Sequence, residues 1–407
     1  MNNYDVAIVG AGPSGILAAI SAAEHHASVI LIDKNNHIGR KILATGNGRC
    51  NITNRDIRAS HYHGRNPKFT EAVFAQFTGQ QTRVFFESIG VILKEEDRGR
   101  LFPRTNQAST VVDALEHKLL DLKIDVRTNF NIKNIQDKNG WDITPENGQV
   151  IHSQKLIIAT GGRAAHHFGS SGDGLFWIKN LGHTIEPIYA SLVPLETVET
   201  WPNDIQGLKI KARVYSVVNN ERVTEKDGDL LFTHYGLSGP AIMGVARDLS
   251  DEKKNNSVEI DLIPDFDSKK LLEKINLIFE QNGSKSILNN LLGFVPKNLL
   301  VQTLKQNNLD QNTKSAEISR AQRQEIVRAL KCLKLRVKKL RPLKEAQVTR
   351  GGIDTLEVDN NSLESLLFPG LYFAGEILDI DADSGGYNLQ WAWSSGYVAG
   401  LHAASKN

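Results

Sequence analysis

The 407-residue sequence contains only two cysteines, Cys50 and Cys332, which lie far apart and in no CxxC pair. A fold held by disulfides is therefore not expected, and a reduced, cytoplasmic setting fits the composition better. The sequence also lacks an uninterrupted apolar run of about 18 residues, the length that a membrane-spanning helix needs. We therefore expect no membrane segment.

Charge of one sign is not in excess. The 48 Lys and Arg residues stand against 46 Asp and Glu residues, which gives a formal net charge of +2. This near-balance argues against a chain built wholly to coat nucleic acid, and we expect a small-molecule substrate instead. No internal repeat or low-complexity tract interrupts the composition of a soluble globular protein, and the length allows two or three domains.

The first 34 residues have the pattern of strand, tight turn, helix and strand. Residues 6–9 are a short apolar run, typical of a parallel strand covered on both faces. Pro13 suits the first turn of a helix, where its missing N–H is no loss. Apolar residues then recur at helical spacing, and a second apolar run over residues 29–32 ends at Asp33.

The turn carries the pattern GxGxxG at Gly10, Gly12 and Gly15. In this setting the first glycine allows a tight turn, the second lets the backbone approach a pyrophosphate, and the third lets helix and strand pack closely. Asp33, about twenty residues on, is placed to accept hydrogen bonds from a ribose. The residues predict a dinucleotide site for FAD or NAD.

A second stretch, GRKILATGNGRCNITN at residues 39–54, favours a ligand other than a simple NAD. An NAD dehydrogenase would continue with further strand–helix units after Asp33. Here, instead, glycines permit a nest of N–H groups, and basic and amide side chains add charge and hydrogen-bonding groups. The glycines, basic residues and asparagines of this stretch are Gly39, Gly46, Gly48, Arg40, Lys41, Arg49, Asn47, Asn51 and Asn54. We expect this loop to lie along an extended anionic ligand.

A third stretch lies near the other end of the chain. An apolar strand over residues 371–374 leads into Gly375-Glu376, and Gly385-Gly386 precede a helix that starts near residue 387. A carboxylate after a strand can bind the ribityl chain of a flavin. The adjacent helix N-terminus suits the N1–C2=O edge, because its dipole stabilises charge on the reduced flavin. Residues 156–162, LIIATGG, resemble another strand with a glycine exit near the cofactor.

These motifs, together with FTHYGLSGPAIM at 232–243 and TRGGI at 349–353, resemble the aminoacetone-oxidase-like FAD-binding flavoproteins over essentially the whole chain. That family also includes enzymes that reduce unsaturated keto bile acids. The resemblance implies an α/β fold: a Rossmann-type FAD-binding domain of the glutathione-reductase kind, with an inserted antiparallel β domain that carries a small helical domain. The corresponding ranges are 1–194 and 347–407 for the FAD domain, 195–267 for the β domain, 268–331 for the helices and 332–346 for a returning β segment.

The resemblance also implies the residues that contact FAD. One departure is Asp33, where a longer Glu is common, which puts affinity rather than identity in question. The implied contacts are Gly10, Gly12, Pro13, Ser14, Gly15, Asp33, Lys34, Arg40, Lys41, Gly46, Gly48, Asn51, Gly161, Gly375, Glu376, Asn388 and Leu389.

The candidates for catalysis are less defined. His234 and Tyr235 belong to the FTHYGLSGP loop, Arg350 could clamp a carboxylate, and Tyr387 starts the last helix. Cys50 lacks a nearby second thiol, so a small buried residue is the better interpretation of it. The histidines show no metal-ligand spacing, and we expect no metal. His61-x-His63 lies on a polar segment and is expected to be solvated.

We therefore expect an FAD-dependent oxidoreductase that acts on a small substrate at flavin N5. No second GxGxxG is present for NAD(P)H, which favours an oxidase of an amino ketone with oxygen as acceptor. An NAD(P)H-dependent reductase of an unsaturated ketone, with NAD(P)H as a transient reductant, stays as the alternative. A flavin-bearing RNA-binding or regulatory protein, using the basic residues of 334–344, is the second alternative. The oligomeric state stays open.

Overall fold

The computed structural model describes residues 2–251 and 253–405. The chain forms two compact units: unit 1, residues 1–191 with 346–407, and unit 2, residues 192–345. Each unit has its own cluster of buried apolar side chains, and the two clusters share no residue. Unit 1 is therefore built from both ends of the chain, and unit 2 from the middle.

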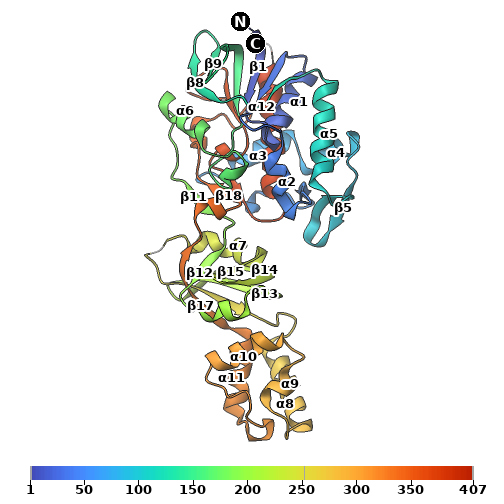
Figure 1. The fold of residues 1–407 in the computed structure, drawn as a ribbon, viewed down its shortest axis with the longest axis vertical. Coiled ribbons are helices and arrows are strands. Elements are labelled where there is room, and N and C mark those ends of the chain that lie inside the picture. Colours follow the sequence, from blue (N-terminus) through green and yellow to red (C-terminus); the bar gives the residue numbers. More distant parts are fainter. Residues whose placement is uncertain (1, 252, 406–407) are drawn as a thin grey trace. The chain divides into compact units, whose positions relative to one another are not determined.

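The main sheet of unit 1 is mixed (Figure 1). Its strands lie in the order β7-β2-β1-β10-β9-β8, and β19 pairs with the carboxyl half of β10. The pairs that join β7, β2, β1, β10 and β19 are parallel, whereas β9 and β8 pair antiparallel. The bounds are β1 (Asn2–Val9), β2 (Val29–Ile32), β7 (Asp125–Arg127), β8 (Ile132–Asp137), β9 (Trp141–Pro145), β10 (Ile151–Ile158) and β19 (Leu371–Phe373).

The two helices next to this sheet come from opposite ends of the sequence. Helix α1 (Pro13–Glu24) packs along α12 (Tyr387–Ala404), and two glycines of α12 make the close approach possible. A Cβ on Gly396 would lie 2.2 Å from the carbonyl oxygen of Ser14, and one on Gly400 would lie 2.2 Å from that of Ala18. The sequence prediction of both helices is confirmed, including the start of α1 at Pro13.

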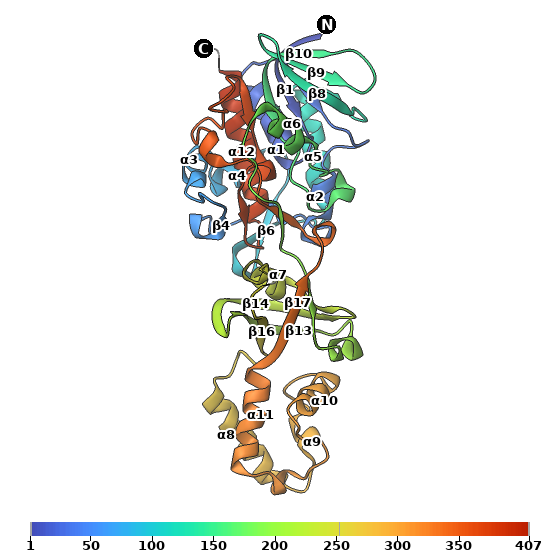
Figure 2. The same cartoon turned by 90° about the vertical axis from the view of Figure 1, so that its left-hand side faces the viewer.

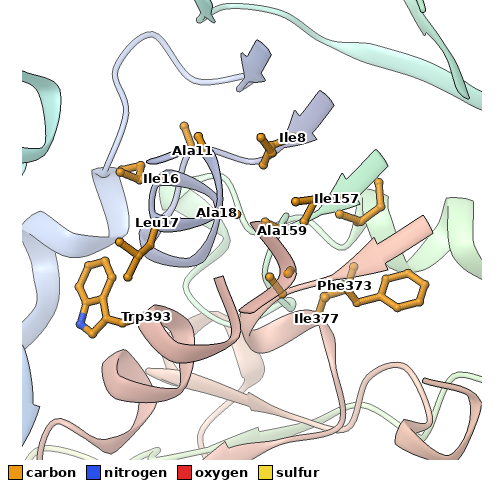
Figure 3. Close-up of a cluster of buried hydrophobic side chains, with 14 of the residues drawn as sticks. Ile8, Ala11, Ile16, Leu17, Ala18, Ile157, Ala159, Phe373, Ile377 and Trp393 are labelled. Atoms are coloured by element: carbon orange, nitrogen blue, oxygen red, sulfur yellow. The ribbon is translucent and has the colours of Figure 1, made fainter. Parts of the chain in front are cut away.

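Side chains from the strands and the two helices fill one core (Figure 3). Ile8, Ile157 and Phe373 come from the neighbouring strands β1, β10 and β19, and all three are fully buried. Trp393 of α12 is fully buried too, and its indole N–H donates to the carbonyl of Ile52 at 2.9 Å. Burial of such side chains contributes about 1.5–3 kcal/mol each, and here it joins the two ends of the chain.

The remaining elements of unit 1 are short, apart from the 14-residue helix α5 (Ala108–Asp121). Two ribbons, β20 with β4 and β11 with β18, and a small sheet β3-β6-β5 accompany five helices. They are α2 (Arg40–Ala44), β3 (Thr53–Asn54), β4 (Tyr62–His63), α3 (Phe69–Gln76), α4 (Gly79–Ser88), β5 (Leu93–Glu96), β6 (Arg100–Pro103), α5 (Ala108–Asp121), α6 (Asp173–Leu181), β11 (Tyr189–Ser191), β18 (Val348–Arg350) and β20 (Asp381–Ala382).

Unit 2 contains a closed antiparallel barrel with strand order β12-β15-β14-β13-β16-β17. The sequence predicted an antiparallel sheet here, and closure is what the structure adds. Asn219-Asn220 and Asp227-Gly228 are turn signals in the sequence, and Asn219 and Asn220 do form a turn, both with positive φ. The turn predicted at Asp227-Gly228 is wrong, because both residues lie inside β14. The strands are β12 (Leu195–Thr197), β13 (Lys209–Val218), β14 (Glu221–Thr233), β15 (Gly236–Ser238), β16 (Asn256–Asp261) and β17 (Leu333–Leu340).

In the sequence, Ser319 with Gln322 has the pattern of a capping box, and Ser268 is placed to cap the helix that follows it. Ser319 caps α11 in the predicted capping box with Gln322. Helix α8 is capped by Asp267 rather than Ser268, because the Asp267 carboxylate accepts the backbone N–H of Lys270 at 2.8 Å. Figure 2 shows α8 to α11 as one helical cluster. The helices are α7 (Pro240–Val245), α8 (Ser268–Gln281), α9 (Ile287–Leu291), α10 (Lys297–Gln306) and α11 (Arg320–Lys331).

Candidate functional site

The glycine turn between β1 and α1 leaves room on one side only. A Cβ on Gly10 would lie 2.4 Å from the carbonyl oxygen of Ala159, and one on Gly15 would lie 1.7 Å from that of Gly10. Around Gly12 no atom lies within 4 Å of the Cβ position. No side chain caps the start of α1 at Gly12, so the first N–H groups of the helix face this open space. These features fit a pyrophosphate.

Asp33 supports the glycine turn from the end of β2. Its Oδ2 accepts the backbone N–H of Ala11 at 2.6 Å, and its Oδ1 accepts the backbone and side-chain N–H groups of Asn35 at 2.7 and 2.9 Å. The short carboxylate therefore ties the turn to the loop after β2. Contact with a ribose stays a prediction, and Lys34, another predicted contact, is paired with Asp173 at 2.7 Å.

The loop of residues 39–54 has the left-handed backbone that its glycines predicted. Gly39, Gly46 and Gly48 have positive φ, and so do Asn47 and Cys50. Cys50 is fully buried, and burial raises the pKa of its thiol to about 12. A protonated thiol is a poor nucleophile at neutral pH, so the structure supports the packing role expected for Cys50.

The polar side chains of this loop divide into two groups. Arg49 turns back onto the protein, where its guanidinium lies 4.1 Å from the Phe102 ring centroid and forms an ion pair with Glu96. Asn51 has a buried Oδ1 without a hydrogen-bond partner among the described residues. A buried acceptor of this kind requires a donor, and a bound ligand would supply one.

The loop meets the carboxyl-terminal motif inside unit 1. Lys41 forms an ion pair with Glu376, whose other carboxylate oxygen accepts the backbone N–H of Thr349 at 2.7 Å. The Asn54 amide donates to the carbonyl of Gly385 at 3.0 Å. The predicted ribityl carboxylate is therefore held by a cation from the loop, and the two distant motifs form one surface.

Helix α12 begins directly after a turn made by Gly385 and Gly386. A Cβ on Gly386 would lie 2.5 Å from the carbonyl oxygen of Thr53, so only glycine fits there. The Asn388 side chain bonds the backbone N–H and carbonyl of Ala382, both at 2.9 Å. The Asn388 side chain is therefore used to secure the turn. Only the backbone N–H of Asn388 is left for a ligand, as one of the N–H groups of the first helical turn that have no partner within the helix.

Gly161 lies on the predicted glycine exit of β10 and has a φ of +72°. Beyond it, Thr349 Oγ1 accepts the backbone N–H groups of Arg163 and Ala164 at 2.8 and 2.9 Å. The exit loop of β10 is thus fixed to β18. The TRGGI motif, which contains Thr349, therefore holds the predicted cofactor loop in place.

The four catalytic candidates divide between the two units. Tyr387 is the first residue of α12; burial, together with the nearby charges of Asp56 and Asp383, raises its pKa to about 12. The Arg350 guanidinium, also in unit 1, lies 5.6 Å from the ring centroid of Tyr189. His234 and Tyr235 belong to unit 2, where Arg341 lies over the Tyr235 ring at 4.6 Å.

Two histidines expected to be solvated instead contact an acid beside the start of α12. His61 and His63 both contact Asp383, and the His61 ring stacks on Tyr387 at 4.2 Å between centroids. The sequence signal for them is the pairing of HxH with the alternating acids of DIDAD, which only the fold brings together. Among residues 2–251 and 253–405, no group of His, Cys, Asp or Glu could hold a metal, and no helix is long and apolar enough to cross a membrane.

The open space at Gly12, the orphaned Asn51 oxygen and the two helix N-termini without a side-chain cap, all in one unit, fit one class: FAD-dependent oxidoreductases with a Rossmann fold. The chain belongs to the family described as HI0933-like protein Rossmann domain, which matches residues 4–402. The suspected family and fold class are thereby confirmed, as is FAD as the cofactor.

Curated relatives cover nearly the whole chain. The 3-dehydro-bile acid delta(4,6)-reductase of Clostridium scindens is 34% identical over 406 residues, which is 98% of this chain and 99% of the relative. The ribosomal RNA dihydrouridine synthase of Escherichia coli is 32% identical over 399 residues, 98% of this chain and 97% of the relative. Both matches extend through the two units.

Solved structures support the fold alone. The 3-ketosteroid delta1-dehydrogenase of Sterolibacterium denitrificans is similar with a TM-score of 0.51 and 13% identity, covering 99% of this chain and 100% of that one. The 3-ketosteroid-delta4-(5alpha)-dehydrogenase of Rhodococcus jostii RHA1 gives a TM-score of 0.50 and 12% identity, covering 100% and 97%.

Proposed function

We propose that this flavoprotein uses NAD(P)H to reduce a carbon–carbon double bond conjugated to a carbonyl. Support comes from a chemical feature common to its relatives. A 3-dehydro bile acid with 4,6 unsaturation has such a double bond, and so does the uracil ring whose reduction gives dihydrouridine. Reduction of an α,β-double bond of this kind adds hydride to the β-carbon and a proton to the α-carbon. FAD, when bound, supplies the hydride.

The observation that carries this choice over an oxidase is that two relatives matching 98% of this chain are a bile-acid reductase and a dihydrouridine synthase. Tyr387 at the start of α12 suits the same chemistry, because its phenol, like that of an ordinary tyrosine, is protonated at neutral pH, and burial raises its pKa further, to about 12. A neutral phenol donates a hydrogen bond to a carbonyl oxygen and so stabilises the enolate that forms as hydride arrives. Oxidation of an amino ketone needs the opposite, a base that removes a proton from the ammonium group.

The test is an anaerobic stopped-flow experiment on FAD-loaded protein. We expect NADH or NADPH to bleach the flavin absorption, and a conjugated enone such as a 3-oxo-4,6-diene steroid, or uridine in ribosomal RNA, to restore it without oxygen. Bleaching by aminoacetone, followed by hydrogen peroxide release in air, would instead support the oxidase.

RNA as the substrate is favoured by the charge of the helical part of unit 2. Residues 268–331 contain 11 Lys and Arg residues against 5 Asp and Glu residues. Exposed lysines with no ion pair among the described residues lie along the helices and their loops; they are Lys285, Lys297, Lys305 and Lys314. The basic strand β17 is a weaker candidate, because Arg336 is paired with Glu199 at 2.9 Å.

A charge-removal variant separates RNA from a small substrate. Changing Lys285, Lys297, Lys305 and Lys314 to Gln should weaken RNA binding and reduce the slope of log K against log salt by up to about 3–4. The matched control changes Lys68, Lys123, Lys133 and Lys179 of unit 1, which are also exposed. Equal loss in both variants, or no RNA binding at low salt, would leave the small enone as the substrate.

A further inference from the structure

Unit 1 contains a carboxylate that contacts two imidazoles. Asp383 Oδ1 lies 3.1 Å from Nε2 of His63, and Oδ2 lies 3.3 Å from Nδ1 of His61. The Asp383 side chain is 16% exposed, and its backbone N–H donates to the carbonyl of His61 at 2.9 Å. The ribbon of β4 and β20, in which His63 pairs with Asp381, fixes these three residues.

The hydrogen bond from His63 to Asp383 sets the roles of the two ring nitrogens. A carboxylate only accepts, so Nε2 carries the proton that points at Asp383. Nδ1 of His63 then has no partner among the described residues. The His63 side chain is 30% exposed, so a substrate can reach it. An imidazole oriented by a carboxylate in this way is a proton-transfer group.

The pair adjoins the start of α12. His61 stacks on Tyr387 with an interplanar angle of 16°, and the Asn388 side chain donates to the carbonyl of Asp383 at 3.2 Å. The turn before α12 therefore contacts both imidazoles through Asp383, and it leads into the helix N-terminus that the sequence predicts for the flavin. The charged and titratable groups around the pair are Asp56, Arg58, His61, Asp381, Asp383 and Tyr387.

Resting on the reductase proposed above, we infer that His63 is the catalytic acid that protonates the α-carbon of the substrate, and that Asp383 and His61 are positioning residues. The double bond gains a hydride, derived from NAD(P)H, at its β-carbon and the Nδ1 proton of His63 at its α-carbon. His63 then regains a proton from water. The sum is one hydride and one proton added across one double bond.

The experiment compares four FAD-loaded variants: His63→Gln, Asp383→Asn, His61→Gln and His152→Gln. The last is the matched control, since His152 lies 2.8 Å from Asp142 in another His–Asp pair of unit 1. Each is reduced anaerobically with NADH or NADPH, then mixed with 2-cyclohexenone or a 3-oxo-4,6-diene steroid. Flavin reoxidation is followed across pH 5.5–9.

His63→Gln should slow reoxidation by about 10²–10⁴-fold and abolish its dependence on pH, while reduction by the nicotinamide keeps its rate. Asp383→Asn should slow reoxidation less and move its pH profile. His152→Gln should match the wild type. Nitrogen-15 NMR of the wild type should report the Nε2–H tautomer for His63, and Asp383→Asn should deplete it.

The outcomes separate the inference from the proposed function. Reoxidation of His63→Gln at the wild-type rate and with the wild-type pH profile would overturn the role of His63 and leave the reductase intact. A wild-type protein whose reduced flavin is reoxidised by no conjugated double bond would overturn both. If His63→Gln no longer binds FAD, the NMR measurement on the wild type decides whether His63 can be the proton donor. An Nδ1–H tautomer of His63 in the wild type would exclude that role.

Discussion

The three glycines of the first turn have different reasons to be glycine. Gly10 and Gly15 are required by the protein itself, since a Cβ on either would collide with backbone atoms. A Cβ on Gly12 would meet nothing in the protein, so the space beside it is open for the predicted pyrophosphate. A substitution at Gly12 therefore separates cofactor binding from folding, which a substitution at Gly10 or Gly15 does not.

Gly12→Val should weaken FAD binding by at least about 100-fold, roughly 3 kcal/mol, because the side chain occupies the pyrophosphate approach. The measurement is flavin content after purification and FAD titration by fluorescence quenching. Gly293→Val in unit 2 is the control, as its Cβ position is also open. A Gly12→Val protein that binds FAD like the wild type would contradict the cradle.

The ion pair of Lys41 and Glu376 joins the loop at residues 39–54 to the end of β19. Both side chains are mostly buried, at 21% and 19% exposure. Removing one partner leaves the other as a partly buried, unpaired charge. The pair therefore contributes to the fold of unit 1 as well as to the shape of the cofactor site.

Glu376→Gln and Lys41→Met should each lower the free energy of unfolding by about 1–3 kcal/mol, and the double variant should lose less than the sum. Urea unfolding of the cofactor-free proteins measures this coupling, and FAD titration of the same variants measures retention. Strictly additive losses would show that the pair contributes no coupling energy.

At the scale of elements, the contact of α1 with α12 is what brings the two ends of the chain together. Small residues on both helices let their backbones approach, and Ser21 Oγ donates to the carbonyl of Tyr397 at 2.8 Å. The sequence shows two amphipathic or apolar helices but not that they face each other. Their pairing depends on glycine positions whose importance appears only when the partner helix is known.

Gly400→Val should lower the stability of unit 1 by about 3 kcal/mol or more, because its Cβ would fall 2.2 Å from the carbonyl oxygen of Ala18, a backbone atom that does not move freely. Flavin content should fall with it. Ala404→Val, at the end of the same helix and only partly buried, introduces the same side chain and should cost about 0.5–0.7 kcal/mol. Similar thermal midpoints for the two variants would contradict this packing.

At the scale of the whole molecule, unit 2 is contiguous in sequence and has its own apolar core, whereas unit 1 needs both chain ends. We expect a fragment of residues 192–345 to fold cooperatively by itself and to bind no FAD. Circular dichroism during heating, with FAD titration as the second measurement, tests this. Gly400→Val should leave the transition of unit 2 unchanged in the full chain. An unfolded fragment would show that unit 2 depends on unit 1.

The insertion that divides the FAD domain can be predicted from the sequence, because each strand and helix of that domain is indicated by a few adjacent residues. Strand β2 lies where the apolar run at residues 29–32 predicts it, and α12 begins at Tyr387 as expected. The finer boundaries within residues 195–346 stay predictions. The turn expected at Asp227-Gly228 is wrong because turn propensity gives way to strand pairing when β13 lies alongside.

The sequence by itself determined the class of this protein, since a glycine turn, an acid after a strand and a helix start are each encoded within a few adjacent residues. Only the tertiary structure decided which polar side chains pair with distant parts of the protein. Lys41 neutralises Glu376 and His63 meets Asp383, in each case across more than 300 residues of sequence, whereas Asn388 holds a turn only six residues away. Local chemistry is legible in a sequence, whereas the pairing of distant polar groups is set by packing.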